Sequence, residues 1–361
     1  MMKINNITMV ETIEGEFTQE TLHSKFSCIP DSKILTYNAG INLGNLFTKF
    51  VGDGNVKDMC LTSARKIHER DAVLKQCDSN LIKVNGQYYV VGEDANTADK
   101  IENRDVEMLK VVAAYAIARM VTSNKKNFTK NNNFRFKAID SQIVIGLCID
   151  EFKDKELVAE MKRNFNQMKF NVEYKDTKFM VNFDVKNLLA EGYCHYQLNR
   201  ELYLNKRRVA YIDVGSKTWD ICIVKKDNIS GELKLDKAFS LTDAGTLFLM
   251  RRIKESITDG PISMEDLELL LRESYVQVGK REYRIEQFND VIKEYAHEYM
   301  REINQEYNNE LAMVNQMVVF GGGAELVFDA FESYFGEDTI VTKLDNAAYV
   351  NAQAYYEASF N

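Results

Sequence analysis

The chain has 361 residues, a length that supports two domains with substantial cores. Apolar residues make up 45% of it and charged residues 28%, which is typical of a globular protein, and there is no apolar run long enough to span a bilayer. The formal net charge of -8 argues against broad binding to nucleic acid, and the polar start shows no secretory signal, so we expect a cytoplasmic protein.

The cysteines predict neither a disulfide framework nor a metal site. Six are scattered along the chain without a CxxC pair, and Cys148, Cys194 and Cys222 stand among apolar or aromatic residues. We therefore expect reduced thiols, most of them buried. Four histidines without metal-ligand spacing argue against structural zinc.

The first half of the chain predicts a mixture of strands and helices. Residues 1–32 have no clean periodicity and are treated as an N-terminal extension. Apolar runs separated by turn signals predict strands at 34–37, 46–51, 81–84, 87–91, 142–147 and 177–185. Helical spacing predicts helices at 105–123, 154–166 and 188–202.

The same kind of order begins again in the second half. Predicted strands lie at 209–214, 218–225 and 318–320, and predicted helices at 243–256, 324–334 and 347–358, with one or two long amphipathic helices within 264–313. Because a β-turn-β unit followed by helices and a buried strand occurs twice, we expect two related α/β domains with the site between them. Residues 33–205 with 343–361 would form the first domain, and residues 206–342 the second.

Three turns have the residues that a triphosphate site needs. Such a site requires glycine for close backbone approach, a cation near the phosphates, and carboxylates that hold Mg²⁺ through water. The first turn runs from Asn42 to Lys49, the second runs from Asp213 to Asp220, and the third is the glycine run 321–323. Asp213 ends an otherwise apolar strand, where a carboxylate is costly unless it is hydrogen-bonded or near a metal.

Each turn also has an ordinary interpretation. The first could be a hairpin with a solvated lysine, the second a capped turn, and the third a flexible connection between a strand and a helix. A true P-loop is absent, because the residues from Gly215 to Thr218 match only the end of its pattern and Ala210 occupies the place of its first glycine.

In this order the three turns resemble the two phosphate loops and the adenosine motif of the superfamily of actin, heat-shock chaperones and sugar kinases. Within it, the ParM-like bacterial actins that segregate plasmids are most similar. Residues 190–193 resemble the segment connecting the domains, residues 145–147 resemble a Gly-Leu-Pro strand end, and Asn346-Ala347 with Asn351-Ala352 fit the final helix. The resemblance covers residue 33 to the end and implies an actin-like (ribonuclease H-like) fold, with two duplicated α/β domains around a nucleotide cleft.

The resemblance also implies roles for single residues. Asp213 would hold Mg²⁺ through water, and Glu191 would orient or polarise the water that attacks the γ-phosphate. The expected nucleotide contacts are Asn42, Gly44, Asn45 and Lys49 in the first turn, Gly215, Ser216, Lys217 and Thr218 in the second, and Gly321, Gly322 and Gly323 for adenosine.

The chain departs from the superfamily's pattern at four positions. Asn42 stands where the first loop usually begins with Asp, and its amide can bond Mg²⁺-bound water but brings no charge. Hydrolysis or Mg²⁺ affinity would therefore be reduced. Lys217 replaces a small residue or Thr and either contacts phosphate or points outward, and Cys148 and Ala190 also depart from the pattern.

The resemblance implies an ATPase that polymerises into nucleotide-dependent filaments and segregates plasmid DNA. Its cofactors would be ATP, with GTP as the alternative, and Mg²⁺. Its partners would be further copies of itself and a DNA-bound adaptor protein at a centromere-like plasmid site, with no direct contact to nucleic acid or membrane. Two alternatives stay open: a small-molecule (sugar or acid) kinase with Asp150 as its base, and a structural filament protein that hydrolyses nucleotide poorly because of Asn42.

Overall fold

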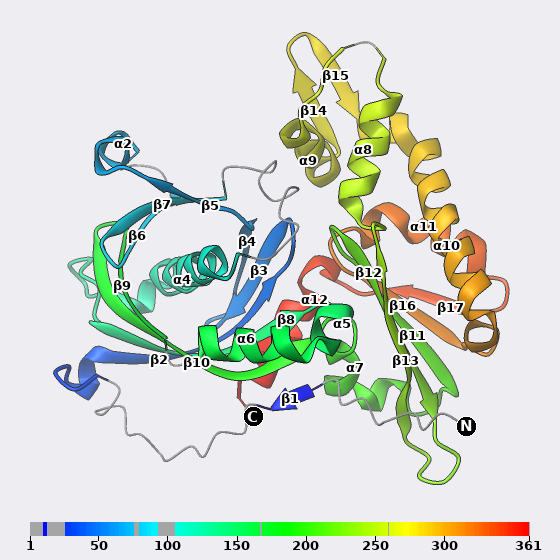
Figure 1. Cartoon of the computed structure of the whole chain (residues 1–361), viewed down its shortest axis with the longest axis horizontal. Helices are drawn as coiled ribbons and strands as arrows, with labels where there is room; N and C mark the ends of the chain where they lie inside the picture. The colour runs from blue at the N-terminus through cyan, green and yellow to red at the C-terminus, as the bar shows by residue number, and fades with distance from the viewer. Residues whose placement is uncertain are drawn as a thin grey trace. The chain divides into compact units, whose positions relative to one another are not determined.

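The computed structural model describes residues 10–12, 26–75, 79–92, 105–166, 168–258 and 260–360, which divide into two compact units (Figure 1). Within these residues, unit 1 comprises 148–150 and 191–351, and unit 2 comprises the rest. The predicted extension at 1–32 lies mostly outside the described residues. The domain boundaries predicted from the sequence stay a prediction.

Unit 2 is built on one mixed sheet. Its strands are β1 (Val10–Thr12), β2 (Ile34–Leu43), β3 (Phe47–Gly52), β4 (Val56–Leu61), β5 (Ala64–Ile67), β6 (Leu81–Val84), β7 (Gln87–Val91), β8 (Ala138–Leu147), β9 (Met168–Tyr174) and β10 (Thr177–Ala190). Their order is β4-β3-β2-β8-β10-β9-β6-β7-β5, and β1 pairs with the end of β10. The central strands β2, β8 and β10 are parallel, and their neighbours on both sides are antiparallel.

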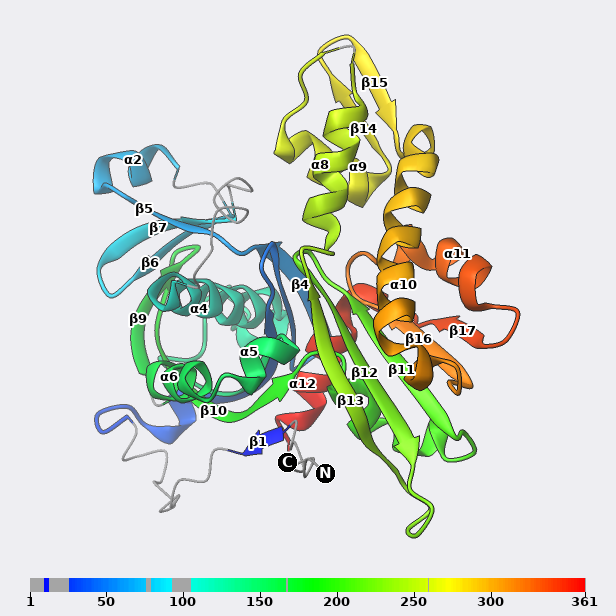
Figure 2. The same cartoon turned by 45° about the vertical axis from the view of Figure 1, so that its right-hand side comes forward.

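The helix α4 (Val106–Ser123) is the centre of the unit 2 core. Its side chains are buried almost all round, which is typical of a helix enclosed by other elements. Figure 1 and Figure 2 both show the strands of the sheet curving around it. Asp105 begins this helix as predicted, because its carboxylate accepts from the backbone N–H groups of Glu107 at 3.0 Å and Met108 at 3.3 Å.

Among the described residues, four further α-helices lie wholly or partly in unit 2: α2 (Glu69–Leu74), α5 (Ile149–Lys153), α6 (Lys155–Phe165) and α12 (Val350–Ala358). The helix α12 continues into unit 2 from Ala352 and lies directly against two strands. A Cβ on Gly40 would lie 2.2 Å from the Ala352 carbonyl oxygen, and one on Gly146 would lie 2.1 Å from the Tyr355 hydroxyl. Gly40 therefore allows the helix backbone to approach β2, and Gly146 leaves room on β8 for the Tyr355 ring.

Unit 1 repeats the order of the central unit 2 strands. Its sheet consists of β11 (Arg208–Val214), β12 (Thr218–Lys226), β13 (Leu233–Thr242), β16 (Gln316–Phe320) and β17 (Ile340–Lys343), in the order β13-β12-β11-β16-β17. The strand β12 is antiparallel to both of its neighbours, β13 and β11, while β11, β16 and β17 are parallel. The run β4-β3-β2-β8-β10 has the same order and directions, so the predicted duplication is confirmed.

The helices of unit 1 are α7 (Cys194–Leu198), α8 (Thr246–Ser256), α9 (Met264–Glu273), α10 (Asn289–Leu311) and α11 (Ala324–Phe335). Trp219 of β12 is fully buried between α10 and α11, with its ring centroid 5.9 Å from Tyr295 and 5.4 Å from Phe331. Cys148, Cys194 and Cys222 are buried, and none of them forms a disulfide with another described residue, as expected. Within the described residues, no helix is both long and apolar enough to cross a membrane.

Two predictions of secondary structure were wrong in part. The expected helix at 188–202 begins only at Cys194, because the three residues before Glu191 continue β10 and pair in register with β8. Between the helices expected at 264–313 lies a hairpin of β14 (Tyr275–Val278) and β15 (Arg281–Arg284). Pairing and burial override local helical preference at both places.

His195 packs against aromatic side chains of the unit 1 sheet. Its ring centroid is 6.2 Å from Tyr211 of β11 and 6.0 Å from Phe320 of β16, and its Nε2 is 3.3 Å from the Tyr203 hydroxyl. Burial disfavours the charged imidazolium and lowers the pKa of His195 to about 4.

We predict that Gly40→Ala destabilises the protein by about 1–3 kcal/mol, since the added methyl group would overlap the α12 backbone. Thermal and urea unfolding would measure the loss. The control is Gly279→Asn in the β14–β15 turn, where a Cβ meets nothing within 4 Å and φ is 63°. Asn tolerates that conformation, so its effect should stay within about 0.5 kcal/mol. Equal effects of the two changes would contradict the packing described for Gly40.

We predict that His195 makes the folded state sensitive to acid. The His195 side chain binds a proton near the ordinary pKa of 6.5 in the unfolded chain but only near 4 in the folded chain. The free energy of unfolding should therefore decrease as the pH is lowered from 6.5 to 4. The loss attributable to this group is about 2–3 kcal/mol. Unfolding of His195→Gln at pH 7 and pH 4.5 should show a smaller loss than the wild type. The exposed His68→Gln control should keep the wild-type slope, and identical slopes for all three proteins would exclude this role.

Candidate functional site

The predicted site residues of unit 1 gather where β11 and β16 end. The two strands are parallel, and Asp213 pairs in register with Phe320. The turns that follow them therefore leave the same edge of the sheet, the edge at which open α/β sheets bind ligands. Asp213 is 4% exposed in a strand whose residues are all buried.

The glycine run 321–323 closes over the Asp213 carboxylate. Gly321 has a φ of 96°, and a Cβ on it would lie 2.1 Å from Asp213 Oδ1. The Gly323 N–H donates to the Val214 carbonyl oxygen at 2.9 Å. Since both the backbone conformation and the space exclude a side chain, Gly321 is required for this turn to lie against the carboxylate.

The turn between β11 and β12 rests on the first turn of α8. The Thr246 N–H donates to the Gly215 carbonyl at 3.1 Å, and the Leu247 N–H donates to the Ser216 carbonyl at 2.9 Å. A Cβ on Gly245 would lie 2.2 Å from the Ser216 backbone, so this contact also depends on glycine. Gly245 was not expected to have a special role, because the helix predicted at 243–256 included it, whereas α8 begins only at Thr246 with Gly245 as its N-cap.

Asp220 has a structural role that the sequence did not reveal. Its carboxylate is 1% exposed and accepts from the Thr218 hydroxyl at 2.7 Å, the Ser240 hydroxyl at 2.5 Å and the Ile149 N–H at 2.9 Å. The last bond holds residues 148–150 on the unit 1 sheet. The Thr218 hydroxyl donates its single proton to Asp220, so a hydrogen bond donated by Thr218 to phosphate would come from its backbone N–H.

The first turn, in unit 2, has the same register as the second. Asn42 pairs with Lys49 across β2 and β3, as Asp213 pairs with Asp220 across β11 and β12. A Cβ on Gly44 would lie 2.5 Å from the carbonyl oxygen three residues ahead, and the matching distance for Gly215 is 2.9 Å. Asn42 therefore occupies in unit 2 the position that Asp213 occupies in unit 1.

The Asn42 side chain is 6% exposed, and its Oδ1 has no hydrogen-bond partner among the described residues. A buried acceptor without a donor costs about 1–3 kcal/mol. Such an oxygen fits a donor supplied from outside the chain, for example a water molecule bound to Mg²⁺. Lys49 is half-buried beside it, and the Thr62 hydroxyl fixes the turn by donating to the Gly44 carbonyl at 2.6 Å.

Glu191 directly follows β10 and belongs to unit 1. It is 8% exposed and precedes Gly192, whose φ of 76° turns the chain toward α7. Unit 1 thus brings Asp213 together with the turns at 215–218 and 321–323. The four predicted residues of the first turn belong to unit 2, and their part in a common site stays a prediction. Asp150, the base of the kinase alternative, is exposed.

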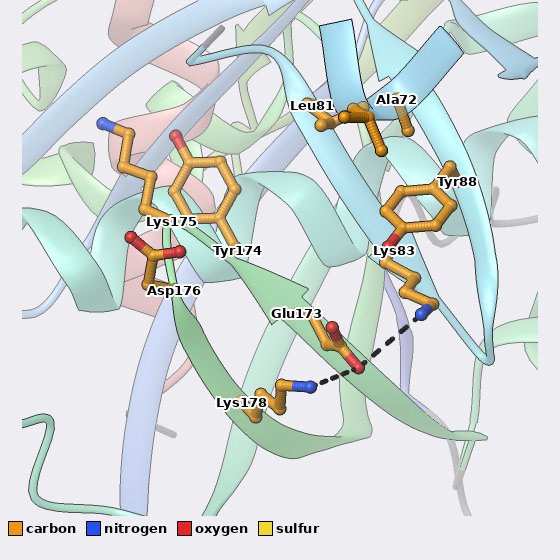
Figure 3. A pocket seen from close by; sticks show the side chains of 10 residues that line it. Ala72, Leu81, Lys83, Tyr88, Glu173, Tyr174, Lys175, Asp176 and Lys178 are labelled. Carbon is orange, nitrogen blue, oxygen red and sulfur yellow. Dashed lines mark ion pairs between the residues drawn. The ribbon is translucent and has the colours of Figure 1, made fainter. Parts of the chain in front are cut away.

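A separate depression of about 300 Å³ lies in unit 2 beside β6, β7 and β9 (Figure 3). Glu173 lies between two lysines there, 3.9 Å from Lys83 Nζ and 3.1 Å from Lys178 Nζ. None of the residues predicted for the nucleotide site lines it. Among the described residues there is also no cluster of three His, Cys, Asp or Glu side chains suited to a metal ion.

Two family models match the sequence, one in each half of the chain. Residues 40–193 match the family model of the N-terminal domain of actin-like proteins, and residues 211–333 match that of the C-terminal part of archaeal MreB-like actin homologues. A comparison with curated proteins found no match.

Solved structures share the whole fold at low identity. A ParM filament from Clostridium botulinum has a TM-score of 0.70 at 18% identity, covering 90% of this chain and 99% of that chain. The actin-like protein Alp7A has a TM-score of 0.69 at 16% identity, covering 90% and 96%. The archaeal actin homologue Ta0583, in complex with ADP, has a TM-score of 0.67 at 14% identity, covering 90% and 99%. With its duplicated sheets and its matches in both halves, the chain has the actin-like fold.

Proposed function

We propose that this chain binds an adenine nucleotide with Mg²⁺ and assembles into filaments whose stability depends on that nucleotide. The observation that carries the proposal is the buried Asp213 carboxylate at the end of β11, with the Gly321 turn folded directly over it. A carboxylate, two glycine turns and backbone N–H groups at the ends of parallel strands are the parts that a phosphate site without a P-loop requires.

In this proposal the residues of unit 1 have separate tasks. Asp213 orients water molecules around the metal, and the backbone of Gly215, Ser216 and Thr218 faces phosphate oxygens. Mg²⁺, when bound with the nucleotide, would neutralise part of the phosphate charge. Lys217 is half-buried in the same turn and would add positive charge, while Gly321, Gly322 and Gly323 leave room for the adenosine.

We propose that the first turn binds phosphate and Mg²⁺ in a similar way, but that it binds Mg²⁺ more weakly. Gly44 and Asn45 offer backbone N–H groups and Lys49 offers an ammonium group. Asn42 contributes an amide oxygen where a carboxylate would bring negative charge. With fewer negative charges near the metal, binding of Mg²⁺ would be weaker, and this supports slow hydrolysis over fast hydrolysis.

We propose plasmid segregation as the biological task, through a DNA-bound adaptor protein. The support is the likeness to a ParM filament and to Alp7A, together with the net charge of -8, which suits an adaptor better than direct binding to DNA. Nucleotide would favour the conformation that polymerises, and hydrolysis would favour another one. ATP is the proposed nucleotide, with GTP as the alternative.

We predict that ATP with Mg²⁺ induces assembly at tens of micromolar protein, measured by light scattering, pelleting and electron microscopy. Gly321→Ala should bind a fluorescent ATP analogue at least about tenfold more weakly, because the new Cβ would overlap the Asp213 carboxylate. Gly231→Asn is the control, since a Cβ there meets nothing within 4 Å and Asn tolerates its φ of 70°. Absence of polymer with ATP and with GTP would exclude the filament proposal.

We predict that Glu191→Gln lowers the rate of phosphate release by about a hundredfold while nucleotide affinity changes little, since the residue is proposed to orient water and not to bind phosphate. Single-turnover release of phosphate, measured beside equilibrium binding, separates the two effects. An unchanged rate would remove Glu191 from the site. A wild-type rate already near that of the variant would instead favour the alternative of a poorly hydrolysing filament protein.

A further inference from the structure

A chain of buried hydrogen bonds ends at the proposed nucleotide site. The Cys194 thiol donates to Asn351 Oδ1 at 3.3 Å, and Asn351 Nδ2 donates to Asp213 Oδ2. The three residues are 1%, 4% and 4% exposed. They come from α7, α12 and β11, so three separate segments of unit 1 meet at one carboxylate oxygen.

The chemistry of the two neighbours determines how the Asn351 amide is oriented. An ionised carboxylate can only accept, so the NH₂ group must face Asp213. The amide oxygen then faces Cys194, whose thiol is a weak donor. If the amide turned around, its oxygen would face the carboxylate and its NH₂ group would face sulfur. The thiol therefore favours the orientation in which Asn351 donates to Asp213.

We propose that Asn351 is a positioning residue for the metal-bound nucleotide, acting through Asp213. Its hydrogen bond holds one carboxylate oxygen of Asp213, which fixes the direction of the other oxygen. That other oxygen, Oδ1, is the atom beside Gly321. This inference rests on the proposed function, because it assigns Asp213 to the metal-bound nucleotide.

The segment that leads into α12 contacts the site at a second point. The Gly321 N–H donates to the Ala347 carbonyl at 2.9 Å, four residues before Asn351. The same short stretch of chain thus holds both the glycine turn and the carboxylate. A neutral donor suits this place, because a lysine or arginine there would compete with the metal for the carboxylate.

The test is the affinity of a fluorescent ADP analogue, measured with Mg²⁺ and again with EDTA, for wild type and for Asn351→Leu. We expect Asn351→Leu to weaken binding with Mg²⁺ by about 10- to 100-fold, as for other residues that orient a metal-binding carboxylate. Binding in EDTA should change by less than about threefold, since the metal is then absent. Gln353→Ala, in the same helix but away from Asp213, is the control and should match the wild type in both conditions.

A second pair of variants tests the orientation of the amide. Cys194→Ser keeps a donor toward Asn351 and should keep wild-type affinity with Mg²⁺, whereas Cys194→Ala removes the donor and should weaken it by about 3- to 10-fold. Circular dichroism and thermal unfolding would confirm that each variant folds. If Asn351→Leu does not fold, the difference between the two Cys194 variants decides the question.

The outcomes separate the two proposals. Equal losses with Mg²⁺ and with EDTA, or no loss for Asn351→Leu, would overturn the positioning role while leaving nucleotide binding intact. Equal affinities of Cys194→Ser and Cys194→Ala would overturn the role of the thiol in orienting the amide. A wild-type chain that binds the analogue in neither condition would contradict the proposed function and this inference with it.

Discussion

The close approach of Gly321 to Asp213 is the constraint on which the unit 1 site depends. Parallel pairing of β11 and β16 brings the ends of both strands to one edge, and the missing side chain at Gly321 lets the second turn fold over the first carboxylate. Asn351 then holds that carboxylate from the other oxygen. Because Asp213 is almost wholly buried, its charge is costly without these partners, so the same contacts that stabilise the fold also prepare the site.

Duplication explains both the likeness and the asymmetry of the two glycine hairpins. Asn42 and Asp213 are the last residues of β2 and β11 that pair with the neighbouring parallel strand, and a glycine follows two residues after each of them. In both turns a carbonyl oxygen leaves no room for a Cβ on that glycine. The charge differs, because the unit 1 turn begins with a carboxylate and the unit 2 turn with the amide of Asn42. The backbone geometry of the two turns is therefore the same although the charge at their first residue differs. The fold alone does not determine the chemistry of the site, which depends on its individual residues.

The secondary structure could be predicted where burial leaves a clear pattern. The central strands β2, β8, β11 and β16 each contain a short, mainly apolar stretch that predicted part of the strand, and the Asn85-Gly86 turn has the positive φ angles that its sequence favours. The strands at the ends of the two larger sheets, β4, β5, β13 and β17, escaped prediction, as did β1, β9, β14 and β15. An edge strand is partly solvated and carries a mixture of charged and apolar residues, so its pattern is weak. The end of β10 was mistaken for helix because its register with β8 comes from a partner far along the chain.

For the candidate site, the sequence by itself determined the residue types and their order: glycine turns, an acid at the end of an apolar strand, and an amide in place of a second acid. Local chemistry suffices for these, because turns and buried strands leave their signal within a few residues. Only the tertiary structure decided which groups meet. Asn351 bonds to Asp213 across 138 positions, and Gly245 supports Ser216 from the far end of another hairpin. Such contacts depend on strand register and on the packing of helices against the sheet, which no short stretch of sequence contains.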